Sequence, residues 1–377
     1  MKLAIIHDEL VRKGGAEQVV LSFHKAFPDA PIYTLCYNAD KTYPEFASCN
    51  IKISWFGRFI KDENNLKRFF FPFAIWAMRQ LDLGDYDVIL QSTTHCSKYI
   101  TLKPGTTVIT YCHTPFRLVW RADTYEEVAK AGFLKKKMYN MVISMLKKID
   151  KKSAEITDWF ITNSKEVVPR IVAAYHPPRP VTVINPPVKC RNFFIAEKTE
   201  DYYLLVSRFE PYKKVDLVIE AFNKMPDRKL IIVGKGSLGD GLKKMAEKNI
   251  SFLNGLSSPE LADCYAKCKG FIFPQLEDYG ITPLEANASG RPVIAYGKGG
   301  VLDTMLPVKN GNCRTATAVF FEQQTTESLC AAIEYFETLT FDPNFIRQHA
   351  ETFDEVFFVE KIRKFVKEKG LTLRDEG

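Results

Sequence analysis

The sequence has little that would suit a membrane-spanning, disulfide-bonded or metal-binding protein. Its longest apolar run, residues 69–78, contains a proline and is too short for a transmembrane helix, and we expect no signal peptide. The nine cysteines include no C-x-x-C pair, and no acidic or histidine cluster has metal-ligand spacing. We therefore predict a cytoplasmic protein with reduced thiols and no bound metal.

Charge is distributed unevenly along the 377 residues. Residues 1–188 contain 26 Lys and Arg against 18 Asp and Glu, a net charge of +8, whereas residues 189–377 contain 26 against 27, a net charge of −1. A basic first half suggests an acidic surface as the partner of that half alone.

Short apolar runs alternate with amphipathic stretches throughout the chain. In residues 1–186 the runs KLAIIHD, PIYTLCY, YDVILQS, TVITYCH and WFITNS are typical of buried parallel strands, with helical patterns between most of them. Five prolines in residues 176–188 indicate a linker, after which the alternation restarts with YYLLVSR and KLIIVGKG. We therefore predict an α/β protein with two Rossmann-like domains, residues 1–186 and 187–353, facing each other across a ligand-binding cleft. A final helix in residues 354–377 could pack back on the N-terminal domain.

Two motifs look functional but have simpler explanations. Gly234-x-Gly236-x-x-Gly239 follows a strand, as in dinucleotide-binding folds, but the next predicted strand, ISFLNG, lacks the acidic residue that would hold a ribose. We interpret these glycines as a tight turn. Asp85-x-Asp87 precedes the strand VILQS at its amino end, and we interpret it as a solvated turn rather than a metal site.

The segment LEDYGITPLEA places two carboxylates around the predicted start of a helix. Glu277 lies in the loop after the strand GFIFPQ, and Glu285 lies eight residues later. Free backbone N–H groups near Ile281 and Thr282 would form an anion site at the helix N-terminus. Thr282 and Glu285 also match a capping box, in which they would satisfy the helix's own donors. Capping leaves Glu277 unexplained.

A second segment, VSRFEPYKK, supplies positive charge. Arg208 ends a predicted strand, and Lys213 begins the next helix. Two cations directed to one place suit a diphosphate, although either of them alone would also be ordinary surface charge.

These residues resemble the retaining GT-B glycosyltransferases of family 4. The C-terminal domains of that family carry an R-x4-K pair, here Arg208 and Lys213, and an E-x7-E motif, here Glu277 and Glu285. HDELVRKGGAEQVV resembles the family's glycine-rich first loop, and YCHTPFRLVW resembles the His-Thr/Ser-Pro segment of a subgroup that often transfers mannose. The family commonly has Lys-Gly where this chain has Lys213-Lys214, which leaves open which lysine reaches the phosphate.

The resemblance implies a role for each of these residues. Arg208 and Lys213 would neutralise the diphosphate of a nucleotide-sugar donor without a metal, and Glu285 would accept hydrogen bonds from the ribose. Glu277 would hold sugar hydroxyls, and His113 would contact the donor sugar or the incoming hydroxyl. The expected catalytic residues are thus His113, Glu277, Arg208 and Lys213. The expected donor site comprises Gly14 and Gly15 beside the phosphates, Leu256 against the base, and Arg208, Lys213, Glu277, Gly280, Ile281, Thr282 and Glu285.

From the resemblance we predict transfer of a hexose, namely mannose from GDP-mannose, to a lipid-linked glycan in cell-surface polysaccharide synthesis (O-antigen, capsule or exopolysaccharide). We expect no further cofactor and no nucleic acid. FLKKKMYNMVISMLKKIDKK, residues 133–152, has seven lysines and one acidic residue beside an apolar stripe, and LKRFFFPFAIWAMR, residues 66–79, adds aromatic residues. Both segments could rest on an anionic membrane at its cytoplasmic face, or could pack on their own domain with the lysines solvated.

Three alternatives remain open from the sequence. A UDP-sugar could replace GDP-mannose, and a sugar-nucleotide epimerase of the same fold would share the nucleotide clamp. A non-enzymatic alternative is a module that binds nucleic acid or another polyanion, against which the −1 charge of the second half and the two-glutamate motif both count.

Overall fold

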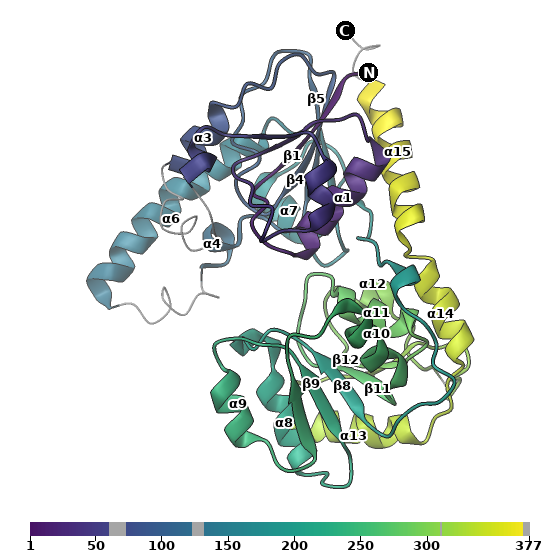
Figure 1. Ribbon diagram of the computed structural model, residues 1–377. Coiled ribbons are helices and arrows are strands. Elements are labelled where there is room, and N and C mark those ends of the chain that lie inside the picture. The colour runs from purple at the N-terminus through teal and green to yellow at the C-terminus, as the bar shows by residue number, and fades with distance from the viewer. Residues whose placement is uncertain (60–72, 123–131, 310, 372–377) are drawn as a thin grey trace. The chain divides into compact units, whose positions relative to one another are not determined.

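The alternating strand and helix patterns fold into two α/β units in the computed structural model, which describes residues 1–59, 73–122, 132–309 and 311–371 (Figure 1). Unit 1 comprises Met1–Pro186 and Phe358–Gly377, and unit 2 comprises Pro187–Phe357. The chain thus leaves unit 1 in the proline-rich segment and returns to it inside its last long helix. Among the helices described, none combines the length and the apolar composition that a bilayer span requires.

Unit 1 is built on a seven-stranded parallel sheet in the order β3-β2-β1-β4-β5-β6-β7. Its strands are β1 (Leu3–His7), β2 (Ile32–Thr34), β3 (Ile51–Ile53), β4 (Val88–Thr93), β5 (Thr107–Cys112), β6 (Trp159–Thr162) and β7 (Thr182–Val183). Its helices are α1 (Gly15–Ala26), η1 (Pro44–Ser48), η2 (Phe56–Phe59), α3 (Ile75–Arg79), α4 (Arg117–Trp120), α6 (Phe133–Ala154), α7 (Val168–Tyr175) and, from Phe358 on, α15 (Glu355–Leu371).

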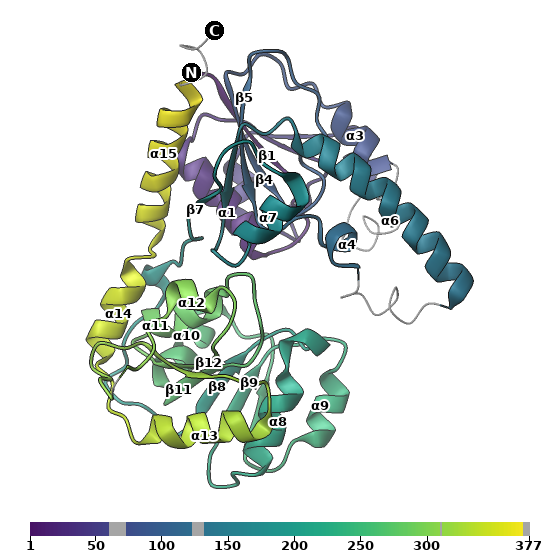
Figure 2. The same cartoon turned by 180° about the vertical axis from the view of Figure 1, so that it is seen from behind.

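Successive side chains of the unit 1 strands enter two different cores, because strand residues alternate between the faces of a sheet. Leu3 and Ile5 pack in one core with residues of α1 and α15, whereas Ala4 and Ile6 pack in the other with residues of α3 and α6. Figure 2 shows α1 and α15 on one side of this sheet and α3 and α6 on the other. Both faces are covered, which is why these strands are almost continuously apolar.

Helix α6 is anchored near its C-terminal end by a buried carboxylate. Asp150 accepts hydrogen bonds from the Tyr99 hydroxyl at 3.0 Å, from Trp120 Nε1 at 2.7 Å and from the Tyr175 hydroxyl at 2.9 Å. Lys98 Nζ lies 2.7 Å from the same carboxylate. A buried charge is tolerated where a countercharge and several donors surround it, so this cluster fixes the end of α6 to the sheet domain.

Unit 2 is built on a six-stranded parallel sheet in the order β10-β9-β8-β11-β12-β13. Its strands are β8 (Tyr203–Val206), β9 (Leu230–Val233), β10 (Ile250–Leu253), β11 (Gly270–Phe273), β12 (Val293–Tyr296) and β13 (Ala318–Phe321). Its helices are η5 (Cys190–Asn192), η6 (Pro211–Lys213), α8 (Val215–Asn223), α9 (Gly239–Met245), α10 (Ser258–Lys267), α11 (Ile281–Ala288), α12 (Val301–Thr304), α13 (Thr326–Glu337) and α14 (Pro343–Glu351).

The two faces of the unit 2 sheet are also both covered. Leu205 packs in a core with residues of α8 and α13, and Leu204 packs in a core with residues of α10, α11 and α14. The predicted α/β class with two Rossmann-like halves is therefore confirmed. Each sheet gathers the loops that follow its strands at one edge, where open α/β sheets bind ligands.

Candidate functional site

The two charged motifs of unit 2 meet at the carboxyl edge of its sheet. β8 and β11 are neighbours, so the loops that carry Arg208 and Glu277 leave the sheet side by side. Lys213 Nζ forms an ion pair with Glu277 Oε1. Arg208 Nη2 donates to the Tyr212 hydroxyl at 3.0 Å, and Lys213 Nζ lies 5.2 Å from the centre of the same ring. The sequence-predicted cations and the first glutamate therefore belong to one cluster.

Lys213 and Lys214 differ in the structure. Lys213 reaches Glu277, whereas Lys214 is the N-cap of α8 and has φ 55° and ψ 34°, in the left-handed region. Glycine adopts this conformation without the steric cost that a side chain carries. The backbone thus explains why a Lys-Gly pair suits this turn.

The loop that carries Glu277 has a conformation that depends on Gly280. Gly280 has φ +84°, and a Cβ atom placed on it would lie 2.7 Å from the Phe273 ring. On the other side, Gly300 N donates to Glu277 O at 2.9 Å. The main-chain conformation around Glu277 is therefore constrained by packing against β11 and by a hydrogen bond from the segment that follows β12.

The capping-box prediction for Thr282 and Glu285 is wrong. Helix α11 begins at Ile281 with Gly280 as its N-cap, and no side chain caps it. Thr282 already lies inside the helix, so its hydroxyl is not at the cap position. Glu285 Oε2 instead accepts a hydrogen bond from the Tyr265 hydroxyl of α10 at 2.8 Å.

Burial raises the pKa of Glu285, and the hydrogen bond from Tyr265 opposes that rise. Tyr265 itself is fully buried and was not among the predicted site residues. A tyrosine on the apolar side of the PELADCYAKC helix is a usable signal, because a buried hydroxyl needs a partner. Leu256, expected against a base, lies three residues beyond β10 and is partly buried against the core of unit 2.

The glycine motif that resembles a dinucleotide fingerprint has a packing role. A Cβ atom on Gly234, whose φ is +151°, would lie 1.8 Å from Ser207 O, directly before Arg208. The interpretation as a tight turn is therefore supported by the structure.

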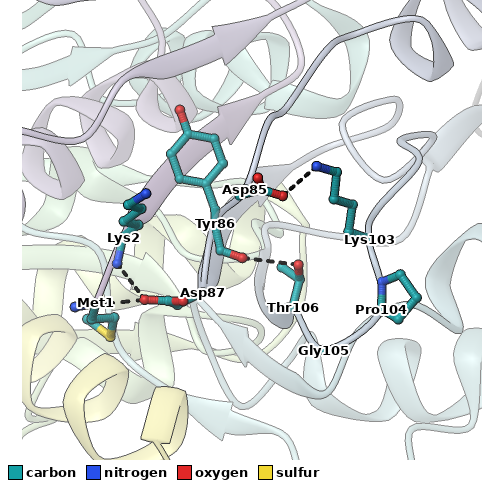
Figure 3. A pocket seen from close by; sticks show the side chains of 9 residues that line it. All are labelled: Met1, Lys2, Asp85, Tyr86, Asp87, Lys103, Pro104, Gly105 and Thr106. Carbon is teal, nitrogen blue, oxygen red and sulfur yellow. Dashed lines mark hydrogen bonds and ion pairs between the residues drawn. The ribbon is translucent and has the colours of Figure 1, made fainter.

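Asp85 and Asp87 line a pocket of about 460 Å³ at the amino edge of the unit 1 sheet (Figure 3). Asp87 Oδ2 accepts a hydrogen bond from Lys2 N at 2.8 Å, and Asp85 forms an ion pair with Lys103 (Figure 3). The two carboxylates have separate partners, as expected for a turn. The absence of a metal in the working protein stays a prediction.

In unit 1, the glycine-rich loop and His113 lie at the carboxyl edge of the sheet. Helix α1 begins at Gly15 with Gly14 as its N-cap, and nothing lies within 4 Å of a Cβ atom placed on Gly15. His113 directly follows β5, its N donates to Thr93 O at 3.0 Å, and its O accepts from Asn163 Nδ2 at 2.9 Å. The backbone of His113 is therefore fixed by both neighbouring strand ends.

Sequence reasoning missed a buried group of charges at the same edge. The ring of His95 lies between two carboxylates, with Nδ1 3.3 Å from Asp8 Oδ2 and Nε2 3.1 Å from Glu9 Oε2. Arg12 reaches Glu9 at 2.7 Å and Glu17 at 3.1 Å. The signal was present, since KLAIIHDEL ends a buried strand with three titratable residues in a row.

These charges shift one another's pKa values. Burial disfavours the charged forms, but Glu9 and Asp8 hold the pKa of His95 well above its ordinary value, and His95 in turn holds the pKa of Asp8 well below. Burial raises the pKa of Glu17 against the opposing effects of His7 and Arg12. The protonated His95 is thus the countercharge of a buried acidic pair.

Among the described residues, Asp8, His95 and Cys96 come close enough together to be considered as metal ligands. The Asp8 carboxylate already accepts backbone hydrogen bonds from Thr94, His95, Cys96 and Ser97. Burial raises the pKa of Cys96 to about 12. Because the oxygens of Asp8 already accept these backbone hydrogen bonds, the cluster suits a structural role.

Comparison with known proteins follows the same division of the chain. Residues 13–191 match the family described as Glycosyltransferase Family 4, and residues 190–352 match Glycosyl transferases group 1. The chain is 24% identical to the alpha-1,3/1,6-mannosyltransferase ALG2 of Candida glabrata, over 93% of this chain and 88% of that protein.

A shorter match is 33% identical to the GDP-mannose-dependent alpha-(1-6)-phosphatidylinositol monomannoside mannosyltransferase of Mycolicibacterium smegmatis, over 30% of this chain and 34% of that protein. The fold is similar to that of sucrose-phosphate synthase from Thermosynechococcus elongatus, with a TM-score of 0.73 and 15% identity over 98% of this chain and 99% of that one. The motifs, the fold and both family matches agree, and the chain belongs to the family 4 glycosyltransferases of GT-B fold.

Proposed function

We propose that the protein transfers mannose from GDP-mannose, with retention of configuration, to a lipid-linked glycan in the synthesis of a cell-surface polysaccharide. The observation that carries this proposal is the ion pair between Lys213 and Glu277, which joins the R-x4-K pair to the E-x7-E motif. The similarity to two mannosyltransferases, one of them GDP-mannose-dependent, supports the choice of sugar and donor.

The donor diphosphate would take over Lys213 from Glu277. Arg208, whose guanidinium is exposed beside Tyr212, would bind the same diphosphate, and the free N–H groups at the start of α11 (Ile281 and Thr282, after Gly280) would add to the positive field. Charge on the leaving GDP is thereby stabilised as the bond between the sugar carbon and the phosphate oxygen breaks. This arrangement requires no metal.

Once released from Lys213, the Glu277 carboxylate would hold hydroxyls of the sugar. Glu285, whose other contact is Tyr265, would accept hydrogen bonds from the ribose. The acceptor oxygen would bond to the sugar carbon on the face from which GDP departs, and its proton would pass to the departing phosphate. His113 would contact the sugar or the incoming hydroxyl, Gly14 and Gly15 would leave room beside the phosphates, and Leu256 would lie against the base.

The N-terminal half of α6 supports a membrane-bound acceptor. Phe133 is 85% exposed, Leu134 is 81% exposed and Met141 is 69% exposed, and Lys135, Lys136 and Lys137 are exposed among them. On the same unit, the exposed Trp55 and Trp76 pack edge to face with ring centres 5.1 Å apart. Exposed aromatic and apolar side chains beside lysines are typical of surfaces that rest on an anionic leaflet. Residues 66–72 of the predicted aromatic segment lie outside the described residues.

Ligand-dependent stability tests the donor. Melting temperature measured with GDP, UDP, ADP and their sugars should rise most with GDP and GDP-mannose, because a ligand stabilises the folded state according to its concentration over its dissociation constant. A melting temperature that rises selectively with UDP would identify a UDP-sugar, instead of GDP-mannose, as the donor.

The reaction is tested with GDP-mannose and a synthetic polyprenyl-diphosphate-linked sugar. We expect transfer only when both are present, and slow hydrolysis with donor alone. Conversion of the donor into an epimer in the absence of acceptor would show the epimerase alternative instead.

A further inference from the structure

Two histidines at the carboxyl edge of unit 1 are joined by one serine hydroxyl. His7 ends β1, Ser92 lies in β4 and His113 follows β5, and these three strands are neighbours in the sheet. Ser92 Oγ lies 3.1 Å from His7 Nδ1 and 3.0 Å from His113 Nε2. His7 is 2% exposed and Ser92 is 0% exposed, so the connection lies inside the protein.

The direction of these hydrogen bonds follows from the chemistry of the atoms. His7 Nδ1 also lies 3.3 Å from the main-chain carbonyl oxygen of Ser92, which can only accept, so His7 Nδ1 carries a hydrogen. Ser92 Oγ then accepts from His7, and because a buried hydroxyl needs an acceptor for its own hydrogen, we assign that hydrogen to His113 Nε2, an acceptor 3.0 Å away. The neutral ring of His113 therefore carries its hydrogen on Nδ1.

We propose that Ser92 and His7 are positioning residues that fix the ring orientation and the tautomer of His113, so that Nε2 is held by Ser92 and is not the base that takes the acceptor's proton. This inference rests on the proposed role of His113 at the sugar or the incoming hydroxyl. It agrees with proton transfer to the departing phosphate, because the imidazole then contributes geometry and hydrogen bonding rather than proton abstraction.

The arrangement is built to be rigid. Ser97 Oγ donates to the Ser92 carbonyl oxygen at 2.9 Å, and the main chain of His113 is tied to Thr93 and Asn163. A buried hydroxyl between two rings has few other ways to satisfy its hydrogen bonds, so the network favours one arrangement.

Imidazole nitrogen NMR tests the tautomer without any reaction. In ¹⁵N-labelled protein, the signals of His113, identified by their loss in His113→Gln, should show a hydrogen-bearing Nδ1 and a hydrogen-free Nε2. In Ser92→Ala, the spectrum should show a mixture of the two neutral tautomers of His113 instead of a single one. The opposite tautomer in the native protein, or an unchanged spectrum in Ser92→Ala, would overturn the inference.

Kinetics test whether the positioning matters for transfer. Ser92→Ala should lower kcat by roughly tenfold, the rate equivalent of about one hydrogen bond, with little change in KM. In a double-mutant cycle, this loss should vanish in the His113→Gln background, because there the serine has no ring to orient. Independent, multiplying losses would instead indicate a merely structural serine and contradict the inference.

A matched control and a conservative variant complete the design. Thr162→Val removes another fully buried hydroxyl, which donates to the Cys112 carbonyl at 2.9 Å but touches neither histidine, and it should leave kcat unchanged. His7→Asn keeps an N–H near the position of Nδ1 and should retain more activity than His7→Phe. If the native protein transfers no sugar at all, the proposed function fails, while the NMR result still decides the tautomer.

Discussion

Lys213 and Glu277, separated by 64 residues in sequence, form an ion pair at the carboxyl edge of the unit 2 sheet. Their side chains are 14% and 21% exposed, so the pair is shielded but open to a ligand. The ammonium group of the lysine is suited to bind the diphosphate of a nucleotide sugar. The carboxylate of the glutamate is suited to accept hydrogen bonds from its hydroxyls. Under the proposed function, this ion pair would keep both groups in place until the donor separates them.

The first prediction concerns Arg208 and Lys213, the diphosphate clamp of the proposed donor site. Arg208→Ala and Lys213→Ala should each lower the rate of transfer by about 100-fold or more, the scale of losing one preorganised charged contact to a leaving group. The measurement is kcat/KM for GDP-mannose, with circular dichroism to establish that each variant is folded. Near-native turnover in both folded variants would refute the assignment of the clamp.

Lys214→Gly is the matched control for Lys213→Ala. Lys214 has a left-handed backbone, so glycine should relieve strain on the order of 1 kcal/mol and raise the melting temperature by roughly 2–4 °C. Transfer should continue at a near-native rate. If Lys214→Gly abolishes transfer and Lys213→Ala does not, then Lys214 is the lysine that reaches the phosphate.

The second prediction separates stability from donor binding at Glu285. Burial raises its pKa, so in the folded protein the ionised carboxylate is disfavoured, and this lowers stability at pH values above its unfolded pKa of about 4.3. Glu285→Gln removes that charge and keeps an acceptor for Tyr265, so the melting temperature at pH 7 should stay level or rise. Affinity for GDP should fall roughly tenfold, because a charged acceptor of the ribose hydroxyls becomes a neutral one.

Calorimetry with GDP and thermal melting of the same samples check the Glu285 prediction. Tyr265→Phe removes the hydroxyl but keeps the carboxylate of Glu285, and it should weaken GDP binding less than Glu285→Gln. Unchanged GDP affinity in Glu285→Gln would show that the ribose is held elsewhere.

The third prediction is a pH dependence that arises from His95. Its folded pKa is raised well above its ordinary value of about 6.5, so its stabilising charge is fully present below pH 6.5 and is lost as the pH rises through the folded pKa. The pKa of Asp8 is shifted in the opposite direction, to a lower value. The contribution of Asp8 to folding stability is therefore constant over this alkaline range of pH. His95→Gln leaves Asp8 and Glu9 without this countercharge, which should cost about 3 kcal/mol or more near pH 6.

Melting temperatures of native protein and His95→Gln between pH 6 and pH 10 test this dependence. The native protein should lose stability with rising pH faster than the variant, so the difference between them should shrink. A difference that stays constant across the range would mean that the charge of His95 does not hold the two carboxylates.

Periodicity and motif spacing were enough to predict the α/β class and the grouping of Arg208, Lys213 and Glu277. Strands in parallel sheets are apolar runs, and their loops gather at one edge, so order along the chain becomes proximity in space. The start of α11 was misjudged by two residues because a capping box and a glycine N-cap have overlapping sequence signals. The contacts of Ser92 with two histidines, and of Tyr265 with Glu285, could not be predicted, because they depend on side chains from different elements meeting in three dimensions.

The last prediction concerns attachment of α6 to a membrane. Asp150 anchors the C-terminal end of this helix, while Phe133, Leu134 and Met138 near its start are exposed. Each lysine near an anionic leaflet contributes about 1 kcal/mol, so Lys135, Lys136 and Lys137 together would give appreciable binding, and salt would weaken it. The native protein should therefore sediment with anionic liposomes at low salt and remain in the supernatant with neutral ones.

Two variants separate the contributions of charge and apolar surface to this binding. Lys135/Lys136/Lys137→Glu should abolish sedimentation, and Phe133/Leu134→Ser should weaken it while leaving the net charge unchanged. The matched control is Lys243/Lys244/Lys248→Glu, which makes the same charge change at exposed positions of unit 2 and should sediment like the native protein. If that control also loses binding, the attraction comes from net charge rather than from α6. If the native protein sediments with neither kind of liposome, the lysines are only solvated. A soluble glycan then becomes the better acceptor for the same donor site.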